Sequence, residues 1–237
     1  MHIEKSAGQL ELLARSPLFK GASEEALQAA LASARIIEVP KGIYLFHQGE
    51  EADAFYVLIE GRARLSQLNA EGHQVIIHFM GPGDGMAIIV ALSNTTYPLS
   101  AEAVADVVAL KWDYESSIEL MERYPHISLN GLRLVASRFR ELQDRYRELA
   151  TERVEQRVAR ALLRLARQVG KKTEEGVLLD LPLSRQDLGE MTGTTLYTVS
   201  RIMSRWEGYG LVVTGRERIV IRNPHGLVII AEDLPPE

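Results

Sequence analysis

The stretch that most constrains the fold of this chain is LSRQDLGEMTGTTLYTVSRIMSRWEGYGLVV, residues 183–213. Ser184 can cap a helix with its hydroxyl, and Asp187 three residues later suits the positive helix end, although a strict capping box has Glu or Gln there. Gly193 permits a tight turn before a second helix that begins at Thr194 or Thr195. We expect the helices to bury the apolar residues that recur at three- and four-residue steps, namely Leu188, Met191, Leu196, Val199, Ile202, Met203 and Trp206.

The outer face of the second helix is rich in hydroxyl groups and arginines: Thr195, Tyr197, Thr198, Ser200, Arg201, Ser204 and Arg205. Two short helices around one glycine, with such a face, are typical of a helix-turn-helix. After Gly210, two apolar runs flank the turn Thr214-Gly215-Arg216-Glu217-Arg218, which predicts a β-hairpin, or wing. Basic groups on helix and wing can grip phosphates on both sides of a groove and so favour DNA binding. The alternative is a helical hairpin whose polar face only meets water.

Composition excludes several other classes of function. The chain has 237 residues, 46% of them hydrophobic and 25% charged, which leaves room for one or two domains. No apolar run could span a bilayer and residues 1–9 lack a signal-peptide core, so we expect a cytoplasmic protein. The lack of cysteine excludes iron–sulfur clusters held by cysteine, disulfides and cysteine nucleophiles. Residues 151–237 carry a net charge of about +1 and residues 1–150 about −6, so phosphate affinity must come from local arrangement.

Residues 35–112 alternate short β-rich runs with glycine turns. We expect strands at 35–39, 43–47, 54–59, 62–68, 75–80, 99–105 and 107–112. Seven or eight short strands in such a stretch are typical of an antiparallel jelly-roll barrel. Short helices are expected before it, at 9–13 and at 26–34 with Ser23 as the cap, and a helical link after it at 114–124.

Pro125 suits the first turn of a long helix that runs to about Ala150. Its apolar residues recur at alternating steps of three and four, the pattern of a heptad seam, and they are Leu132, Val135, Phe139, Leu142, Tyr146 and Leu149. The stripe is narrow and flanked by charges, which favours a dimer interface over the alternative, a helix that packs on its own barrel. Beyond it we expect a hinge at Thr151-Glu152.

The segment after the hinge leads back to the helix-turn-helix. We expect Thr151 to cap a helix at 152–169, Gly170 to end it as a left-handed glycine, a polar loop at 171–176 and a strand at 177–181. The tail after Asn223-Pro224 is uninformative. Enzyme motifs are absent: His73 and His78 have poor spacing for joint metal ligation, and Gly81-Pro82-Gly83-Asp84-Gly85 lacks the Lys-Ser/Thr of a phosphate loop.

Two segments resemble the Crp/Fnr family of bacterial transcription regulators. KGIYLFHQGEEADAFYVLIEGRARL, residues 41–65, is similar to the family's paired strands, and residues 183–212 are similar to its helix-turn-helix in length and spacing. The resemblance implies an α+β fold with an effector-sensing β jelly-roll domain (1–112), a linker and dimerisation helix (113–150), and a winged helix-turn-helix DNA-binding domain (151–237). It also implies a homodimer that binds palindromic double-stranded promoter DNA, with an effector moving the hinge. The alternative is a ligand-binding β-roll protein that regulates a protein partner.

Two departures from the family pattern carry information. Cyclic-nucleotide-binding members pair a Gly-Glu-Leu segment with an Arg-Ser-Ala segment, and here the corresponding residues are Gly85-Met86-Ala87 and Leu99-Ser100-Ala101. A buried phosphate without its arginine loses a charge-assisted contact worth about 1.5–3 kcal/mol, so we expect no cAMP binding by the usual mode. On the recognition helix, Tyr197 stands where many members have Glu, so we expect a changed half-site, with Arg201 contacting guanine and Ser200 supporting it.

The effector stays open between an apolar small molecule, a haem with His78 as candidate ligand, and no ligand. Residues 94–104 show a weak similarity to nitrogen-oxide-responsive members of the family. The predicted effector pocket comprises Met86, Ala87, Leu99, Ser100 and Phe139. The predicted DNA contacts are Ser184, Arg185, Thr195, Leu196, Tyr197, Thr198, Ser200, Arg201, Arg205, Arg216 and Arg218. RNA polymerase is the expected further partner, since Lys171–Glu175 lies where family activators can touch it.

Overall fold

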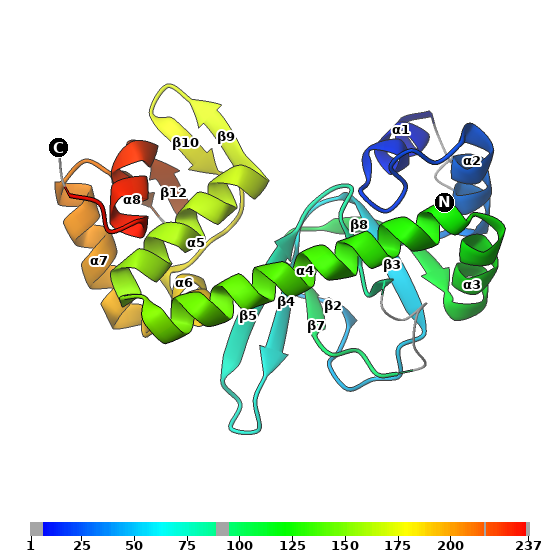
Figure 1. The fold of residues 1–237 in the computed structure, drawn as a ribbon, viewed down its shortest axis with the longest axis horizontal. Helices are drawn as coiled ribbons and strands as arrows, with labels where there is room; N and C mark the ends of the chain where they lie inside the picture. Colours follow the sequence, from blue (N-terminus) through cyan, green and yellow to red (C-terminus); the bar gives the residue numbers. More distant parts are fainter. Residues whose placement is uncertain (1–6, 89–94, 216, 236–237) are drawn as a thin grey trace. The chain divides into compact units, whose positions relative to one another are not determined.

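The computed structural model describes residues 7–88, 95–215 and 217–235 (Figure 1). The chain divides into two compact units, one formed by residues 1–73 and 77–141 and the other by residues 74–76 and 142–237. Among the described residues, no helix combines the length and the apolar character needed to cross a bilayer.

The first unit is built on two antiparallel sheets. One sheet has the strand order β1 (Arg35–Val39), β8 (Val107–Asp113), β3 (Ala54–Glu60) and β6 (Gly85–Met86). The other has the order β2 (Tyr44–Phe46), β7 (Ser100–Ala103), β4 (Ala63–Leu68) and β5 (Gln74–Met80). The seven strands predicted from the sequence all form, within one or two residues at each end. The short strand β6 was not predicted individually.

Three short helices and the start of a long one complete this unit: α1 (Ala7–Arg15), α2 (Glu24–Ser33), α3 (Tyr114–Arg123) and α4 (Pro125–Thr151). Ser23 caps α2 as predicted, because its hydroxyl accepts a hydrogen bond from Ala26 N. One apolar core lies between the helices and the first sheet and includes Phe19, Phe55, Trp112 and Ile127. A second core, with Phe46, Tyr56, Met80 and Met86, fills the space between the sheets. The jelly-roll expectation is therefore confirmed.

The second unit combines helices with a four-stranded sheet. It contains α5 (Val154–Val169), α6 (Arg185–Thr192), α7 (Leu196–Gly208) and α8 (Pro224–Ala231). The sheet order is β11 (Val212–Gly215), β12 (Arg218–Ile221), β10 (Gly176–Leu179) and β9 (Gly170–Thr173). The strands β11 and β12 pair antiparallel and form the predicted wing. The core collects fully buried apolar side chains from every helix, among them Leu162, Leu188, Val199, Trp206 and Leu227.

Two predictions for this unit are wrong, the cap of α5 and the conformation of the chain directly after it. Thr151 does not cap α5: it remains in α4 with its hydroxyl bonded to Arg147 O, and Arg153 is the N-cap. Gly170 ends α5 as predicted, but it is extended rather than left-handed, because the chain enters β9 at once and the predicted polar loop is partly strand. The strand predicted at 177–181 forms as β10, which begins one residue earlier and ends two residues earlier. The tail contains α8, which the dipeptide Asn223-Pro224 signals, since Asn223 accepts from Gly226 N and proline suits a first helical position.

Candidate DNA interface and effector cavity

The two helices of the helix-turn-helix are fixed by their caps. Ser184 Oγ accepts a hydrogen bond from Asp187 N at 3.0 Å, and Asp187 Oδ2 accepts one from Ser184 N at 2.8 Å. This reciprocal pair is a capping box formed by Asp instead of Glu or Gln. Gly193 then takes the left-handed conformation with φ 63°, as the turn requires, and Thr195 Oγ1 caps α7 by accepting from Thr198 N. Ser184 and Thr195 were both predicted to contact DNA, but in the structure their hydroxyls form helix caps.

The helix α7 buries one face and exposes the other. Val199, Ile202, Met203 and Trp206 are buried, as predicted. Leu196 was expected to point inward but is 39% exposed, because it lies in the first turn, before the helix meets the core. Met191, likewise expected inward, is half-buried. The predicted DNA contacts Tyr197, which is 83% exposed, and Arg201 lie on the open face, with Thr198 and Ser200 half-buried beside it.

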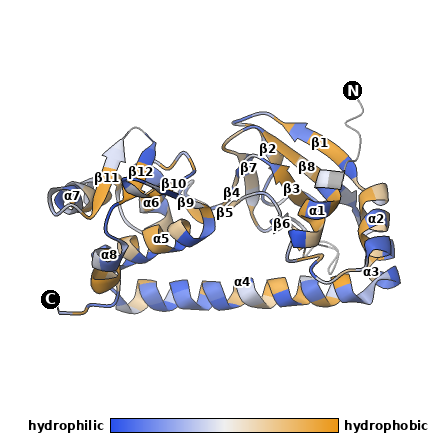
Figure 2. Cartoon of the chain, turned by 90° about the horizontal axis from the view of Figure 1, so that it is seen from above, coloured by the Kyte–Doolittle hydropathy of each residue, from blue (hydrophilic) through white to orange (hydrophobic). Residues whose placement is uncertain are grey.

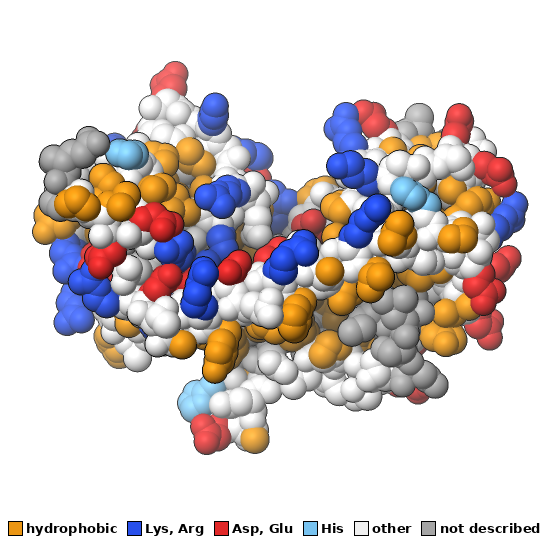
Figure 3. All heavy atoms as spheres, viewed as in Figure 1, with side chains coloured by type: hydrophobic (Ala, Val, Ile, Leu, Met, Phe, Trp, Pro, Cys, Tyr) orange, Lys and Arg blue, Asp and Glu red, His pale blue; other side chains and the backbone are white. Residues whose placement is uncertain are grey.

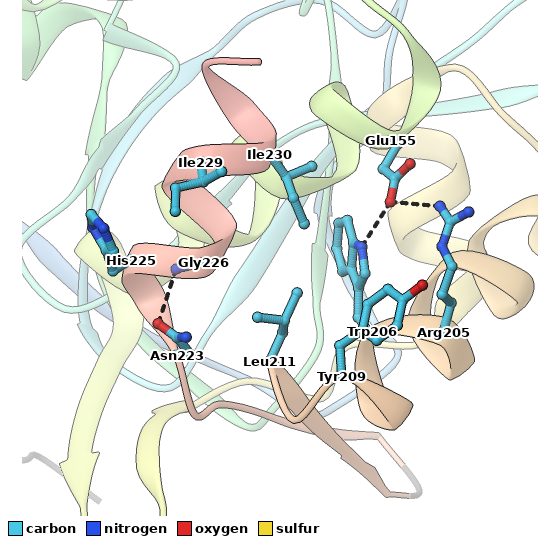
Figure 4. Close-up of a pocket in the computed structure, with 10 residues that line it drawn as sticks. All are labelled: Glu155, Arg205, Trp206, Tyr209, Leu211, Asn223, His225, Gly226, Ile229 and Ile230. Carbon is cyan, nitrogen blue, oxygen red and sulfur yellow. Dashed lines mark hydrogen bonds and ion pairs between the residues drawn. The ribbon is translucent and has the colours of Figure 1, made fainter. Parts of the chain in front are cut away.

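Arg205 lies on the same helix as Arg201 but is placed differently. Its guanidinium forms an ion pair of 2.5 Å with Glu155 of α5, and the same carboxylate oxygen accepts the indole N–H of Trp206 at 2.9 Å (Figure 4). These residues line a groove of about 510 Å³ together with Leu211 and residues of α8. Arg205 therefore ties α7 to α5. Glu155 was missed by the sequence reasoning, although an acid in the first turn of α5 is a visible signal.

The wing is tied to the helices through Thr214. Its backbone N–H and its hydroxyl both donate to Glu207 of α7, and these bonds hold the pKa of the Glu207 carboxyl below its usual range. Arg185 Nη2 donates to the same hydroxyl at 3.1 Å, and Arg218 forms an ion pair with Glu175. Both arginines were predicted to contact DNA. The other wing residue of that prediction, Arg216, lies outside the described residues.

The exposed face of α4 carries the predicted seam. Leu132 and Phe139 are each 59% exposed, and Leu142, Tyr146 and Leu149 are between 53% and 75% exposed. Apolar residues recur along the otherwise polar helix (Figure 2), and charged and apolar side chains lie next to one another over α4 (Figure 3). Val135 is the exception, because it is half-buried and faces its own β-roll. The first half of α4 therefore packs on its own unit, through residues such as Ile127 and Leu134. The dimer interface stays a prediction for the exposed seam residues.

The first unit encloses a cavity of about 240 Å³ between its sheets and α4. Met86, Ala87 and Leu99, all predicted for an effector pocket, line it. Phe139 and Ser100, predicted with them, are not among its described lining residues. Phe139 points outward, and the Ser100 hydroxyl accepts a hydrogen bond from Gln48 N at 2.9 Å. The remaining wall is apolar except at one end: Phe46, Leu65, Ile77, His78, Met80, Gly85, Ile88, Tyr97, Pro98, Leu134, Val135 and Arg138.

The polar end of this cavity joins His78 to Arg138. Arg138 Nη1 lies 2.9 Å from His78 Nε2 and 3.2 Å from Glu141 Oε2. Burial raises the pKa of the nearby Asp84 carboxyl, although the hydrogen bond from Gly81 N and the charge of Arg138 act in the opposite direction. The sequence reasoning counted Arg138 only among the charges that flank the seam of α4. Its spacing contained a signal, since it lies one turn beyond Leu134 and Val135, which also line the cavity.

Comparisons with known proteins agree with both units. Residues 36–124 match the cyclic nucleotide-binding domain, and residues 156–229 match the Crp-like helix-turn-helix domain. The chain is 30% identical over 207 residues to the cyclic AMP receptor protein of Thermus thermophilus, covering 87% of this chain and 93% of the relative. It is 27% identical over 222 residues to the CRP-like cAMP-activated global transcriptional regulator of Mycobacterium tuberculosis, covering 90% and 98%. The solved structure of FixK2 from Bradyrhizobium japonicum superposes with a TM-score of 0.74 at 26% identity, covering 83% and 96%.

A β-roll with a ligand-sized cavity, followed by a long helix and a winged helix-turn-helix, defines a DNA-binding transcription regulator rather than an enzyme. Together with the relatives, these features show that the chain belongs to the Crp/Fnr family.

Proposed function

We propose that this regulator binds a palindromic operator as a homodimer and that an effector in the β-roll cavity controls it. The observation that supports operator recognition is the open face of α7. There Arg201 is exposed and has no ion pair or hydrogen bond with any of the described residues, while the caps and the buried face hold the helix in place. An arginine can donate two hydrogen bonds to guanine O6 and N7, which makes Arg201 the base-reading residue of the proposal.

Tyr197 and Ser200 define how the operator differs from the usual half-site of the family. The uncharged Tyr197 hydroxyl is a weaker acceptor for cytosine N4 than a carboxylate is, but it can reach a phosphate, and its ring can contact a thymine methyl. Ser200, half-buried beside Arg201, supports the arginine. The base usually read by Glu is therefore expected to change.

The exposed seam of α4 supports the homodimer. A row of large apolar side chains on one helix is unfavourable in water and is covered when two copies pair in register. A two-fold dimer would present two α7 helices to half-sites about one turn of DNA apart. Replacing Phe139 and Leu142 by Glu should give monomers in sedimentation experiments and weaken operator binding by more than about a hundredfold, since one half-site would remain. A dimer that survives both substitutions would contradict the proposed interface.

The operator sequence can be identified in vitro. Selection from random double-stranded DNA with the full-length protein should enrich an inverted repeat, and gel shifts across a salt series should give a steep salt dependence. An enriched site without two-fold symmetry would contradict the proposed homodimer on DNA. The absence of any enrichment, with and without cell extract as a source of effector, would contradict operator binding.

The cavity wall supports an effector other than cAMP bound in the usual way. Met86 and Leu99 line the cavity at the positions where the resemblance implies Glu and Arg in cyclic-nucleotide-binding members. Calorimetry should therefore show no nanomolar or low-micromolar binding of cAMP.

Haem is the second candidate effector, and the residues present fit it poorly. Arginine can only donate hydrogen bonds, so the bond from Arg138 directs the Nε2 lone pair of His78 toward the guanidinium and away from a metal. Among the described residues, no group of three or more His, Asp or Glu side chains is arranged to hold a metal ion either. Reconstitution with hemin should accordingly give no Soret band of bound haem, and a stoichiometric band would reverse this interpretation.

The hairpin of β9 and β10 is the proposed contact with RNA polymerase. Its exposed residues 171–175, which comprise part of β9 with Lys172 and the turn at Glu174, are those that the resemblance assigns to activation. Because a chromosomal operator lies in the cytoplasm, we also propose that the protein acts there. Substituting Lys172 by Glu should lower activated transcription in vitro while operator affinity stays unchanged. Equal transcription by both proteins would contradict this contact.

A further inference from the structure

The β-roll cavity combines an apolar body with one cationic end. Its wall is formed by aliphatic and aromatic side chains, and the only charged residue among the described lining residues is Arg138. His78 is 6% exposed and stands next to it. The hydroxyl of Tyr97, the other polar lining side chain, is already bonded to Asp53 Oδ1 and Ala54 O. A ligand that fills this cavity therefore has one place to put a polar group.

Arg138 keeps donors that a ligand can use. Within the described part of the chain, every hydrogen bond of Arg138 starts from Nη1, so Nε and Nη2 retain theirs. Its ion pair with Glu141 is an i,i+3 pair whose two side chains are 40% and 43% exposed. Such pairs contribute little in water, so Glu141 can be displaced by an anion at low cost. His78 holds the Nη1 side of the guanidinium at the cavity end and so fixes its direction.

We propose that the effector is a small apolar molecule with a single carboxylate, whose carboxylate pairs with Arg138 and whose hydrocarbon part fills the cavity. This inference rests on the proposed role of the cavity as effector site and adds the chemical class of its ligand. An arginine fork binds a carboxylate through two parallel hydrogen bonds, which makes Arg138 selective for an anion over an uncharged polar group. The apolar wall selects a hydrocarbon, because burying unpaired hydroxyl or amine groups there is unfavourable.

A cyclic nucleotide suits this cavity less well than a carboxylate. Its base and ribose carry several hydrogen-bonding groups besides the phosphate, and Arg138 and His78 are the only described lining side chains that could receive any of them. The wall would leave most of these groups without partners, and each such group lowers affinity.

The test uses calorimetry on the full-length protein with straight-chain carboxylates from butanoate to decanoate and the primary alcohols of the same lengths. The best carboxylate should bind at least about tenfold more tightly than its alcohol, since only the carboxylate forms a charge-assisted pair. Arg138→Gln should reduce this preference to less than about threefold, and Arg138→Lys should retain part of it. Arg140→Gln is the matched control, because Arg140 is an exposed arginine of the same helix outside the cavity, and it should leave the preference intact.

The opposite results would overturn the inference. Two such results are equal binding of carboxylates and alcohols and no binding of any carboxylate. Two others are a preference for carboxylates that survives Arg138→Gln and tight cAMP binding that depends on Arg138. Gel shifts with the selected operator separate this failure from that of the proposed function. If the carboxylate binds through Arg138 but leaves operator affinity unchanged, the ligand class stands and the control of DNA binding fails. If no carboxylate binds while the operator still does, the ligand class alone fails.

Discussion

Each of the two units contains one of the chain's two tryptophans, and the two are buried equally but bonded differently. Trp112 and Trp206 are both 0% exposed. Trp112 stacks on Phe55 and donates its indole N–H to a backbone carbonyl, Ala30 O of α2, at 2.8 Å. Trp206 donates to a side chain, the Glu155 carboxylate that also holds Arg205. The first bond joins two parts of a core, whereas the second joins α7, the helix proposed to read DNA, to α5.

The largest expected effect is on stability and is similar for both tryptophans. Trp112→Ala and Trp206→Ala should each lower the free energy of unfolding of their own unit by about 3–5 kcal/mol, because each removes a large buried side chain. Since each variant keeps the other tryptophan, chemical unfolding followed by its fluorescence, together with circular dichroism, tells which unit has lost stability. A loss below about 1 kcal/mol in either case would mean that the side chain is not packed as described.

The next effect distinguishes the two arginines of α7. Arg201→Ala should cost about 1–3 kcal/mol in operator binding and relax the preference at one guanine, with little change in stability. Arg205→Ala is the comparison, since the same truncation four residues later removes an arginine that is already paired with Glu155. Arg205→Ala should reduce operator affinity less than Arg201→Ala does, and it should lower the free energy of unfolding more. Gel shifts and thermal unfolding of both variants measure the difference, and equal losses of affinity would show that the pairing does not matter.

A smaller effect is expected when Glu155 loses its charge. Glu155→Gln keeps an acceptor for the Trp206 indole but removes the anion that holds Arg205, so stability should fall by up to about 1 kcal/mol. At low salt, operator affinity should rise, because Arg205 becomes available to a phosphate. An unchanged affinity would indicate that Arg205 already contacts DNA in the wild type.

The smallest effect concerns pH and the β-roll. Because burial raises the pKa of Asp84, folding disfavours its ionised form, and stability is highest below the usual Asp value and declines as pH rises through the raised one. Asp84→Asn keeps an acceptor for Gly81 N but removes this titration. Trp112 fluorescence in denaturant should show a smaller decline between about pH 4 and pH 7 for the variant than for the wild type. A larger decline of stability with pH in the variant would mean that the ionised Asp84 carboxylate stabilises the fold, as the neighbouring arginines would do in the absence of burial.

The sequence predicted elements well where a local rule decides them. The strands of the β-roll follow from alternation and glycine turns, α6 and α7 from Ser184, Gly193 and Thr195, and the wing from two apolar runs around a turn. The boundary at Thr151 was wrong because local capping rules favour Thr over Arg, whereas α4 continues through Thr151 and Glu152 N still bonds back to Glu148 O. Where α4 ends and α5 begins is therefore decided by the backbone hydrogen bonds of the last turn of α4 rather than by one capping residue.

The candidate sites were predicted less completely, because sequence shows which residues are basic but not what they pair with. Arg185, Arg205 and Arg218 were grouped with Arg201 as DNA contacts, yet each of the three has a partner inside its own unit. Arg138 was counted only among the charges that flank the seam, although helical spacing places it beside Leu134 at the cavity. In both cases the missing information is a partner that lies at least 29 residues away in the chain.

The last turns of α4 bear on how this protein can be dissected. Glu148 is 6% exposed and accepts two hydrogen bonds from Arg164 of α5, and Arg160 pairs with Glu152. A DNA-binding fragment started at residue 151, the domain boundary predicted from the sequence, would leave the Arg164 guanidinium without its carboxylate, a loss of about 3–5 kcal/mol where such a pair is buried. A fragment started at Leu142 keeps the pair. Limited proteolysis that spares residues 142–151 would show that the stable DNA-binding domain begins with the last turns of α4.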